Sequence, residues 1–463
     1  MTGSMAQDTI VAIATPPGRG GIGIVRLSGP GAPRLLSPQL ELRSSLQPGR
    51  ARYCAIVDGG ARLDDGVVTY FAAPNSYTGE DVLEIAAHGS PVILDLLVRR
   101  ALEAGARLAR PGEFTQRAFL HGRIDLTQAE AVRDLIAAET LYQARVAAEQ
   151  LGGALGRRLA PVKEQLVALV TLLEAGIDFA DDDVDVTPDV EIAQRLDTLD
   201  ASLAPIAATF HEGRLVHNGL TMAIVGRPNA GKSSLFNRLV ERERAIVTST
   251  PGTTRDLVTE RISLGGIPVE MVDTAGLRET EDEAESHGIA RTEGAMAEAD
   301  LVLLLLDATA AVDANGVLRL PEEDARLLAS LDGRSPLLVL NKIDLARPAS
   351  VNGVTEELAQ VSALTGEGVL ALRERLLERV RGAGNNPGND AAGGMLTSLR
   401  HYEALQGCTQ ALLRARGALT QRVPHEMLLL DLYAALQQLD QLTGATTADD
   451  ILNRIFSSFC IGK

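Results

Sequence analysis

The sequence predicts a multidomain α/β protein in which an α+β N-terminal domain is followed by a discontinuous helical bundle, with a P-loop nucleotide-binding domain inserted into that bundle. Three observations lead to this prediction. A glycine-rich phosphate-binding pattern lies at residues 226–233. Long helical patterns lie on both sides of it, and short β-like runs with glycine turns fill the N-terminal part. The expected domain boundaries are 1–123, 124–217, 218–380 and 381–463.

Residues 1–123 are expected to form the α+β domain, because short apolar runs alternate there with turn residues. One helical pattern, over residues 91–103, interrupts these runs. The runs that we expect to be strands cover residues 10–13, 23–27, 67–71 and 82–85.

Residues 124–217 and 381–463 are expected to be the two halves of one helical bundle. Each half carries apolar residues at helical spacing, which indicates one buried helix face. These apolar stripes consist of Val162, Leu166, Leu169, Val170 and Leu173 in the first half, and of Leu428, Leu432, Leu436 and Leu439 in the second. A run rich in Gly, Asn and Pro at 382–388 predicts a flexible linker.

The segment GRPNAGKS at 226–233 follows an apolar run at 222–225 and precedes a helical pattern at 235–239. This is the strand, loop and helix context that a P-loop requires. Backbone N–H groups of such a loop and the following helix N-terminus favour a phosphate chain. We expect Lys232 to reach the β- and γ-phosphates and Ser233 to bind Mg²⁺.

The base of the nucleotide is predicted from two segments further along. A strand-like run at 337–340 ends in Asn341-Lys342-Ile343-Asp344. The Asp344 carboxylate can accept both the N1–H and the 2-amino group of guanine, a donor pair that adenine lacks. The backbone of Ser362-Ala363-Leu364 is expected to contact guanine O6. The sequence therefore predicts GTP as the ligand.

Asp273-Thr274-Ala275-Gly276 closes another apolar run, at 269–272. Asp273 can hold Mg²⁺ through water, and the Gly276 N–H can sense the γ-phosphate. In Ras-like proteins the next residue is a glutamine that orients the attacking water. Here it is Leu277, which can neither donate nor accept a hydrogen bond. Another group must therefore position the water.

Two features could replace that glutamine. The Asn229 side-chain carbonyl could help to hold a monovalent cation beside the phosphates, with further oxygens from the loop 248–254, in which Thr254 is the expected Mg²⁺ ligand. An acidic segment follows Leu277, and any of its carboxylates could position water or be a solvated loop charge. These carboxylates belong to Glu279, Glu281, Asp282, Glu283 and Glu285.

Composition limits the remaining classes of function. The chain has 463 residues, 45% of them hydrophobic, with no apolar run of membrane-spanning length and no signal-peptide pattern. Cys54, Cys408 and Cys460 are too far apart for a disulfide framework or a zinc site, so a cytoplasmic location is expected. The net charge of −17 argues against general adhesion to nucleic acid. Arginines recur between positions 99 and 123, where they could be solvated surface charges or could contact a polyanion. The sequence leaves both alternatives open.

Several motifs together resemble the MnmE (TrmE) family of tRNA-modification GTPases over nearly the whole chain. These are ATPPGRGG at 14–21, PNSYTGED at 74–81, RPGEF at 110–114, GTTRD at 252–256 and the terminal FCIGK at 459–463. The resemblance implies a Ras-like G domain and a homodimer formed through a folate-binding N-terminal domain. It also implies an FAD-containing partner like MnmG, and addition of aminomethyl-type groups to C5 of wobble uridine in tRNA.

In this family a tetrahydrofolate derivative, 5-formyl- or 5,10-methylene-tetrahydrofolate, supplies the one-carbon unit, and GTP hydrolysis depends on K⁺. By resemblance, K⁺ would contact Asn229, Thr248, Thr250 and Thr253, while Mg²⁺ would contact Ser233 and Thr254. The implied catalytic residues are Glu285, Lys232 and Asn229. The implied folate contacts are Arg26, Glu84, Arg123 and Lys463. A nucleophilic role for Cys460 has no independent signal, since a small packed side chain would explain it equally well.

The residues expected to contact the nucleotide are Asn229, Ala230, Gly231, Lys232, Ser233, Ser234, Thr248, Ser249, Thr250, Pro251, Gly252, Thr253, Thr254, Asp273, Thr274, Ala275, Gly276, Asn341, Lys342, Asp344, Ser362 and Ala363. An alternative function is a ribosome-assembly or RNA-binding GTPase, in which hydrolysis times a binding event. Such proteins usually add a basic RNA-binding domain, and no such domain is visible in this acidic sequence.

Overall fold

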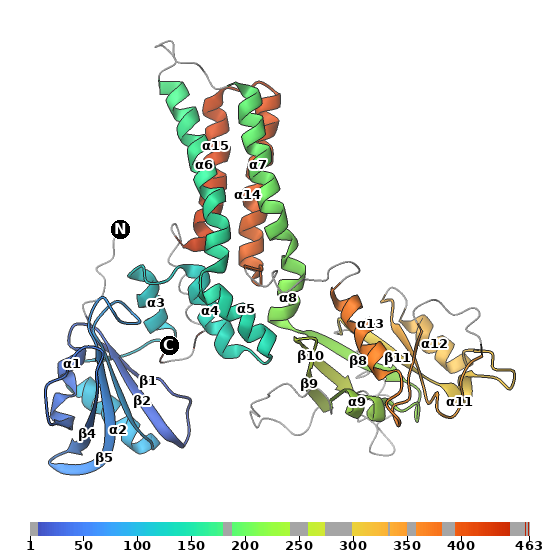
Figure 1. Ribbon diagram of the computed structural model, residues 1–463, viewed down its shortest axis with the longest axis horizontal. Coiled ribbons are helices and arrows are strands. Elements are labelled where there is room, and N and C mark those ends of the chain that lie inside the picture. Colours follow the sequence, from blue (N-terminus) through green and yellow to red (C-terminus); the bar gives the residue numbers. More distant parts are fainter. Residues whose placement is uncertain are drawn as a thin grey trace. The chain divides into compact units, whose positions relative to one another are not determined.

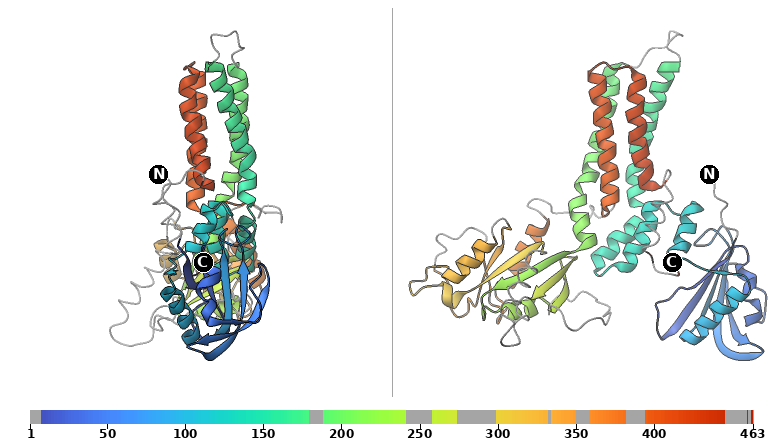
Figure 2. Two further views of the ribbon diagram at one scale, coloured as in Figure 1. Left: turned by 90° about the vertical axis from the view of Figure 1, so that its left-hand side faces the viewer. Right: turned by 180° about the vertical axis from the view of Figure 1, so that it is seen from behind.

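The computed structural model describes residues 8–178, 188–240, 258–273, 299–331, 334–349, 358–381 and 394–444, together with Phe459 and Gly462. The chain divides into two compact units. The first contains residues 1–133, 150–196 and 407–463, and the second contains residues 134–149 and 197–406. Figures 1 and 2 show the elements of each unit, coloured along the sequence.

The first unit contains a seven-stranded sheet with strand order β3-β4-β5-β6-β2-β1-β7. Neighbouring strands are antiparallel except β1 and β7, which are parallel. α2 (Pro91–Glu103) covers one face of the sheet, where Leu94 and Leu97 pack against Val25 and Ile85. The strands are β1 (Ile10–Ile13), β2 (Gly20–Ser28), β3 (Leu40–Leu42), β4 (Ala51–Asp58), β5 (Ala61–Phe71), β6 (Val82–Gly89) and β7 (Arg107–Leu108).

Short helices lie between and after the strands of this sheet. α1 (Ala32–Leu35) and a 3₁₀ turn (Ser37–Gln39) follow β2, whereas α3 (Glu113–Leu120) follows β7. α4 (Leu126–Ala137) begins directly after them. The predicted α+β character of this part is confirmed, because the expected strands fall in β1, β2, β5 and β6 and the expected helix is α2.

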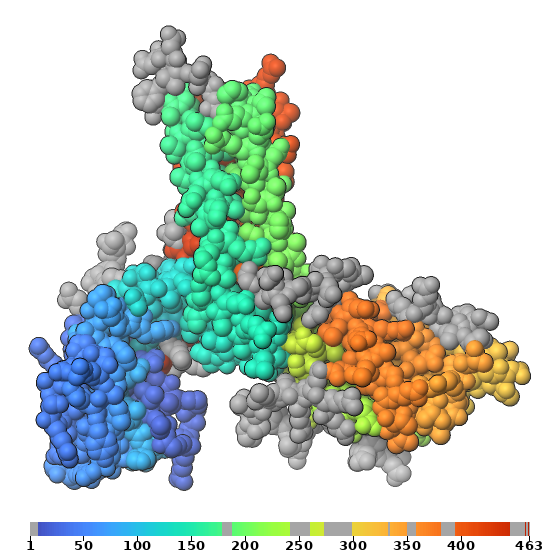
Figure 3. Space-filling view, viewed as in Figure 1, coloured from blue at the N-terminus to red at the C-terminus, as the bar shows by residue number. Residues whose placement is uncertain are grey.

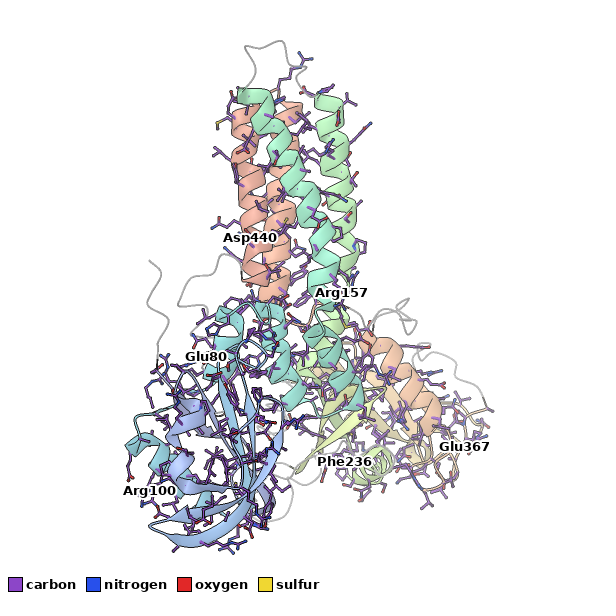
Figure 4. The ribbon with its side chains drawn as sticks, turned by 60° about the vertical axis from the view of Figure 1, so that its left-hand side comes forward. Glu80, Arg100, Arg157, Phe236, Glu367 and Asp440 are labelled. Atoms are coloured by element: carbon purple, nitrogen blue, oxygen red, sulfur yellow. The ribbon has the colours of Figure 1, made fainter. Side chains whose placement is uncertain are left out.

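A helical bundle forms the remainder of the first unit. It consists of α6 (Ala154–Asp178), α15 (His425–Thr443), and the parts of α7 (Asp189–Ala208) and α14 (Leu399–Thr420) that belong to this unit. α6 and α15 pack against each other, and Figure 3 shows the surface of α6 in teal. Lys163 of α6 pairs with Asp440 of α15 at 2.5 Å, and Figure 4 labels Asp440.

The predicted apolar stripes are confirmed in α6 and need one correction in α15. Val162, Leu166, Leu169, Val170 and Leu173 are all buried in α6. In α15 the buried residues are Leu428, Leu432, Ala435, Leu439 and Leu442. The prediction that Leu436 belongs to this buried face is wrong: it is only partly buried, because the buried positions alternate in steps of four and three and so include Ala435 instead.

The second unit contains a six-stranded sheet with strand order β13-β12-β11-β8-β10-β9. Its pairs are parallel except the β9–β10 hairpin. α9 and α13 bury their apolar faces on one side, where they meet Ile224 of β8, and α11 and α12 lie on the other side, where Val225 points. The elements are β8 (Leu220–Gly226), α9 (Lys232–Val240), β9 (Val258–Leu264), β10 (Ile267–Asp273), β11 (Leu301–Asp307), α11 (Ala308–Ala311), α12 (Glu322–Ser330), β12 (Leu337–Asn341), β13 (Ala359–Gln360) and α13 (Val369–Arg381).

Helical residues of the second unit pack against the edge of this sheet. α5 (Leu141–Leu151) begins beside the β9–β10 turn, where the Thr140 hydroxyl donates to the Gly266 carbonyl at 2.6 Å. Glu139 pairs with Arg261 of β9. α8 (Phe210–Asn218) leads directly into β8. The expected domain boundaries at 123, 217 and 380 stay a prediction.

Candidate nucleotide-binding site

The loop between β8 and α9 forms the candidate phosphate site. β8 ends at Gly226 and α9 begins at Lys232, as the strand, loop and helix pattern predicted. The Lys232 ammonium donates to the carbonyl oxygens of Gly226 and Arg227, each at 2.9 Å. The loop therefore closes around this ammonium group. Phosphate oxygens are stronger acceptors for an ammonium than these neutral carbonyls.

Glycine is required at two positions of this loop. Gly226 has a φ of +153° and Gly231 a φ of +95°. A Cβ atom on Gly226 would lie 2.4 Å from the Leu305 carbonyl oxygen, and one on Gly231 would lie 2.3 Å from Nδ2 of Asn341. Side chains at either position would separate the loop from β11 or β12. Asn229, with a φ of +63°, occupies the left-handed region that asparagine tolerates better than most residues.

Asn341 joins the phosphate loop to the segment that is expected to hold the base. It lies at the end of β12 and is buried. Its Nδ2 donates to the Ala230 carbonyl at 2.8 Å, and its Oδ1 accepts from the Ala363 N–H at 2.9 Å. Ser362, also buried, accepts through its hydroxyl from the Thr365 N–H at 3.1 Å. Three predicted contact regions therefore meet at the carboxyl ends of the parallel strands, where α/β sheets bind ligands.

Lys342 and Asp344 follow Asn341 at the same sheet edge. Lys342 has a φ of +66°, and its ammonium lies 2.6 Å from Oδ2 of Asp307. Burial raises the pKa of Asp307, but hydrogen bonds from Lys342 and Thr309 outweigh it and hold that pKa below its ordinary value. Asp307 therefore stays ionised at neutral pH. Asp344 is exposed, so its carboxylate is accessible to a ligand.

The described part of the chain contains only some of the predicted site residues. Asn229, Ala230, Gly231, Lys232, Ser233, Ser234, Asn341, Lys342, Asp344, Ser362 and Ala363 lie around the P-loop edge of the sheet. Asp273 ends β10, beside β8, although its side chain is not among the described ones. The remaining predictions lie outside the described residues: Thr248, Ser249, Thr250, Pro251, Gly252, Thr253, Thr254, Thr274, Ala275, Gly276, Leu277, Glu285, Cys460 and Lys463.

The described residues fit a magnesium ion that binds together with a nucleotide. Within the described ranges no group of three His, Cys, Asp or Glu side chains could hold a metal alone. Ser233 is the second residue of α9, next to Lys232, and its hydroxyl is a hard oxygen ligand. Mg²⁺ is usually bound by one or two protein oxygens together with substrate phosphates. Ser233 fits that requirement.

A second group of predicted residues lies on the sheet of the first unit. Arg26 of β2 and Glu84 of β6 are cross-strand neighbours, and Nε of Arg26 lies 2.8 Å from Oε1 of Glu84. The Arg26 guanidinium also lies over the rings of Tyr77, at 5.9 Å, and Phe114, at 5.7 Å. Its Nη1 donates to the Gly462 carbonyl at 3.3 Å. The end of the chain therefore reaches this sheet, beside two of the predicted folate contacts.

Arg123, the third predicted folate contact, is exposed. Its Cγ would lie 3.4 Å from a Cβ atom on Gly79, which has a φ of +80°. Arg123 thus lies against the loop that contains Tyr77. Tyr77 and Phe114 were not predicted as site residues, although both belong to motifs that carry the family resemblance. The presence of one aromatic residue in each of these motifs was the sequence signal that could have found them.

Two arginines of the basic segment 99–123 lie in a partly buried ion-pair network. Arg117, whose side chain is 7% exposed, pairs with Asp8 at 2.8 Å and with Glu80 at 3.0 Å. Arg107 pairs with Glu113 at 2.6 Å and with Asp8 at 2.7 Å. Burial raises the pKa of Glu113, but the hydrogen bond from Arg107 and the other favourable contacts lower it below the ordinary value. Figure 4 labels Glu80 in this network.

Arg100 in the same segment is also paired, with Asp58 at 2.7 Å and with Glu103 at 2.6 Å. Four of the six arginines between 99 and 123, including Arg110 with Glu113, therefore form ion pairs within the chain. This favours a structural explanation of the basic segment over a continuous polyanion contact. The Glu113 and Arg117 spacing on α3 was the sequence signal for such pairing.

A mostly parallel sheet, a P-loop closed around a lysine, and a buried asparagine that joins that loop to a second loop define a Ras-like P-loop GTPase domain. Family comparisons are consistent with this class and are more specific. The family model described as "MnmE helical domain" matches residues 126–460, and the family model described as "GTP-binding protein TrmE N-terminus" matches residues 9–123. The chain belongs to the MnmE (TrmE) family of tRNA modification GTPases.

Curated relatives match over their whole length. A protein from Koribacter versatilis named tRNA modification GTPase MnmE is 57% identical over 462 residues, covering 99% of both chains. A protein of the same name from Methylococcus capsulatus is 45% identical over 99% of both chains. Among solved structures, the G domain of the T. maritima FeoB iron transporter is 26% identical, covering 34% of this chain and 97% of that one, with a TM-score of 0.25. None of the helices in the described ranges is long and apolar enough to cross a membrane.

Proposed function

We propose that this protein hydrolyses GTP and uses the hydrolysis to drive a modification of tRNA at C5 of the wobble uridine. The observation that carries the proposal is the pair of hydrogen bonds made by Asn341, which ties the P-loop to the 362–364 segment. A P-loop and a base-binding loop held together in this way suit a ligand with a phosphate chain at one end and a purine at the other.

The guanine preference is proposed from Asp344. Its exposed carboxylate follows Lys342 at the ligand-binding edge of the sheet. A carboxylate there matches the two adjacent donors of guanine, and with adenine it would lose both hydrogen bonds. The backbone of 362–364 would contact O6. The other nucleotide contacts would be those predicted from the sequence, from Asn229 to Ser234, in 248–254 and in 273–276.

For hydrolysis, we propose that K⁺ and Glu285 replace the glutamine of Ras-like proteins. Asn229 is exposed on the P-loop, so its side-chain oxygen is accessible to a cation. Thr248, Thr250 and Thr253 would complete the K⁺ site, and Thr254 would join Ser233 on Mg²⁺. A cation beside the phosphates offsets the charge that develops in the transition state. Glu285 would orient the attacking water.

The N-terminal sheet is proposed to bind a tetrahydrofolate derivative that supplies the one-carbon unit. The pterin edge carries an amide N–H next to a 2-amino group, a donor pair that a carboxylate such as Glu84 can accept. Arg26, Arg123 and Lys463 would hold the anionic glutamate tail. Arg26 is held between two aromatic rings and the Gly462 carbonyl, so it is already ordered for such a contact.

We further propose that the protein acts in the cytoplasm as a homodimer, together with an FAD-containing partner like MnmG. Reduction chemistry at the uridine needs a redox cofactor, and a flavin on a partner would provide it. The 5-formyl and 5,10-methylene forms of tetrahydrofolate both carry a one-carbon unit that could form the new bond to C5.

Mass spectrometry of nucleosides from total tRNA tests the proposal. A strain without this gene should lose C5-aminomethyl-type uridines, and wild-type protein should restore them. Lys232→Ala should not restore them, whereas Lys163→Ala should, because Lys163 lies in the helical bundle and pairs with Asp440. Unchanged wobble uridines together with accumulated ribosomal precursors would instead favour an assembly GTPase.

A further inference from the structure

Arg238 of α9 is bound to the backbone of the 362–364 segment. Its Nε donates to the Ala363 carbonyl at 3.1 Å, and its Nη2 donates to the Leu364 carbonyl. Gly366, in the same turn, lies opposite the guanidinium, and a Cβ there would be 4.0 Å from Cζ. One arginine therefore holds two successive carbonyls of the segment that is proposed to contact guanine O6.

Ala363 is held from the other side as well. Its N–H donates to Oδ1 of Asn341 at 2.9 Å, so both of its backbone polar groups are bound by side chains from other elements. Leu364 is 77% exposed, which means that burial of its side chain does not fix this part of the turn. Polar contacts to the backbone must fix it instead, because exposed loops are otherwise mobile.

The position of Arg238 on α9 connects the two ends of the proposed nucleotide site. α9 starts with Lys232 and Ser233, which are proposed to bind the phosphates and Mg²⁺. Arg238 lies six residues later, about 9 Å along the helix axis at the usual rise per residue. Because a helix is rigid over this length, the arginine sets the distance between the P-loop and the 362–364 segment.

We propose that Arg238 is a positioning residue for guanine recognition: it fixes the Ala363–Leu364 backbone so that the Leu364 N–H meets O6 of the base. The inference rests on the proposed base site and extends it to a residue that does not touch the nucleotide. The planar guanidinium presents its donors to the two carbonyls in one rigid geometry, whereas a lysine ammonium would reach them through rotatable donors on a flexible stem.

Nucleotide analogues separate this role from a general effect on the fold. 6-Thio-GDP keeps the N1–H and the 2-amino group of GDP but presents a poor acceptor at position 6, whereas IDP keeps O6 and lacks the 2-amino group. The affinity ratio of GDP to 6-thio-GDP therefore measures the contact at O6. The ratio of GDP to IDP measures the contact that Asp344 is proposed to make.

The experiment is titration calorimetry of the full-length protein with GDP, 6-thio-GDP and IDP. Arg238→Met should lower the GDP to 6-thio-GDP ratio roughly three- to tenfold, the size of one neutral hydrogen bond, and leave the GDP to IDP ratio unchanged. Arg238→Lys should give an intermediate value. Arg326→Met is the matched control, since Arg326 is an exposed residue of α12 that pairs with Glu322.

Asp344→Asn should change the other ratio: it should lower the GDP to IDP ratio and leave the GDP to 6-thio-GDP ratio at its wild-type value. If Arg238→Met weakens all three ligands equally, or none, the positioning role is wrong even though Asp344→Asn behaves as expected. If Asp344→Asn leaves the GDP to IDP ratio unchanged, the proposed base site itself is wrong, and the inference about Arg238 falls with it.

Discussion

Asn341 and Ala230, which are 111 residues apart in the sequence, are joined by a buried hydrogen bond of 2.8 Å from Nδ2 of the asparagine to the alanine carbonyl. Because Oδ1 of the same side chain accepts from the Ala363 N–H, one amide group serves two loops. Gly231 lies so close to this amide that even one methyl group would collide with it. The position of the P-loop therefore depends on β12 as well as on β8 and α9.

Asn341→Ala should weaken GDP binding and lower the stability of the fold. The variant leaves a buried carbonyl and a buried N–H without partners, and each such loss costs about 1–3 kcal/mol. Calorimetry with GDP measures the loss of binding, and urea unfolding measures the loss of stability. Asn341→Asp keeps the acceptor for Ala363 and loses the donor to Ala230. Its GDP affinity and its stability should therefore lie between those of wild type and Asn341→Ala. Wild-type GDP affinity in Asn341→Ala would show that the Asn341 hydrogen bonds to Ala230 and Ala363 do not contribute to nucleotide binding.

Glu285→Ala should keep the affinity for GTP and lose hydrolysis. A group that positions the attacking water acts on the transition state and not on the bound ground state. Removing such a group typically costs 10²- to 10⁴-fold in rate. Single-turnover hydrolysis and a fluorescent-nucleotide titration separate the two quantities. Glu281→Ala in the same acidic segment is the control, and a wild-type rate in Glu285→Ala would remove Glu285 from the active site.

Asn229→Ala should abolish the dependence of hydrolysis on K⁺. The proposed K⁺ site uses the Asn229 carbonyl, and without that ligand the rate in K⁺ should fall to the rate that wild type shows in Na⁺. The measurement is kcat at fixed ionic strength in KCl and in NaCl. Asn315, an exposed asparagine in the turn after α11, offers the matched control Asn315→Ala. A K⁺ response that persists in Asn229→Ala would place the cation elsewhere.

Local sequence patterns predicted the elements of the site well. The run 222–225 lies in β8, the run 337–340 lies in β12, and the helix 91–103 is α2 with the same bounds. Each of these depends on neighbours within a few residues, through apolar periodicity and through the turn residues that end a strand or a helix. The same applies to α6, where every predicted stripe residue is buried.

Long-range pairs were not predictable from one sequence. Arg26 was predicted to be near folate, but its pairing with Glu84 depends on the register of β2 and β6. Arg238 and Ala363 are 125 residues apart and approach each other only after the sheet has formed. β4 (Ala51–Asp58) was also missed, because its apolar residues alternate weakly with polar ones and it gains its order from β3 and β5.

Glu84→Gln should weaken the binding of 5-formyltetrahydrofolate by about tenfold or more. A neutral amide cannot accept from both pterin donors, and charge-assisted hydrogen bonds are roughly twice as strong as neutral ones. Equilibrium dialysis with the folate derivative measures the effect, and GTPase activity should stay at the wild-type level. Glu103→Gln is the control, since Glu103 pairs with Arg100 at the end of α2. Unchanged binding would exclude the Glu84 carboxylate from the folate site.

Glu113→Gln should destabilise the protein at neutral pH, and the difference from wild type should shrink as the solution is acidified. The native pKa of Glu113 lies below its ordinary value of 4.5, because its arginine partners outweigh the effect of burial. A group with a lowered native pKa stabilises the fold above the pKa of the unfolded chain and loses that effect as the pH falls through the native pKa. Removing one partner of a buried ion pair costs about 3–5 kcal/mol, and the loss of only the charge should lie at or below that range. Urea unfolding of wild type and Glu113→Gln, at pH 7 and at several values down to about pH 2, measures this difference across both pKa values. Glu103→Gln is an exposed control. A difference that does not change with pH would show that the Glu113 charge does not contribute to stability.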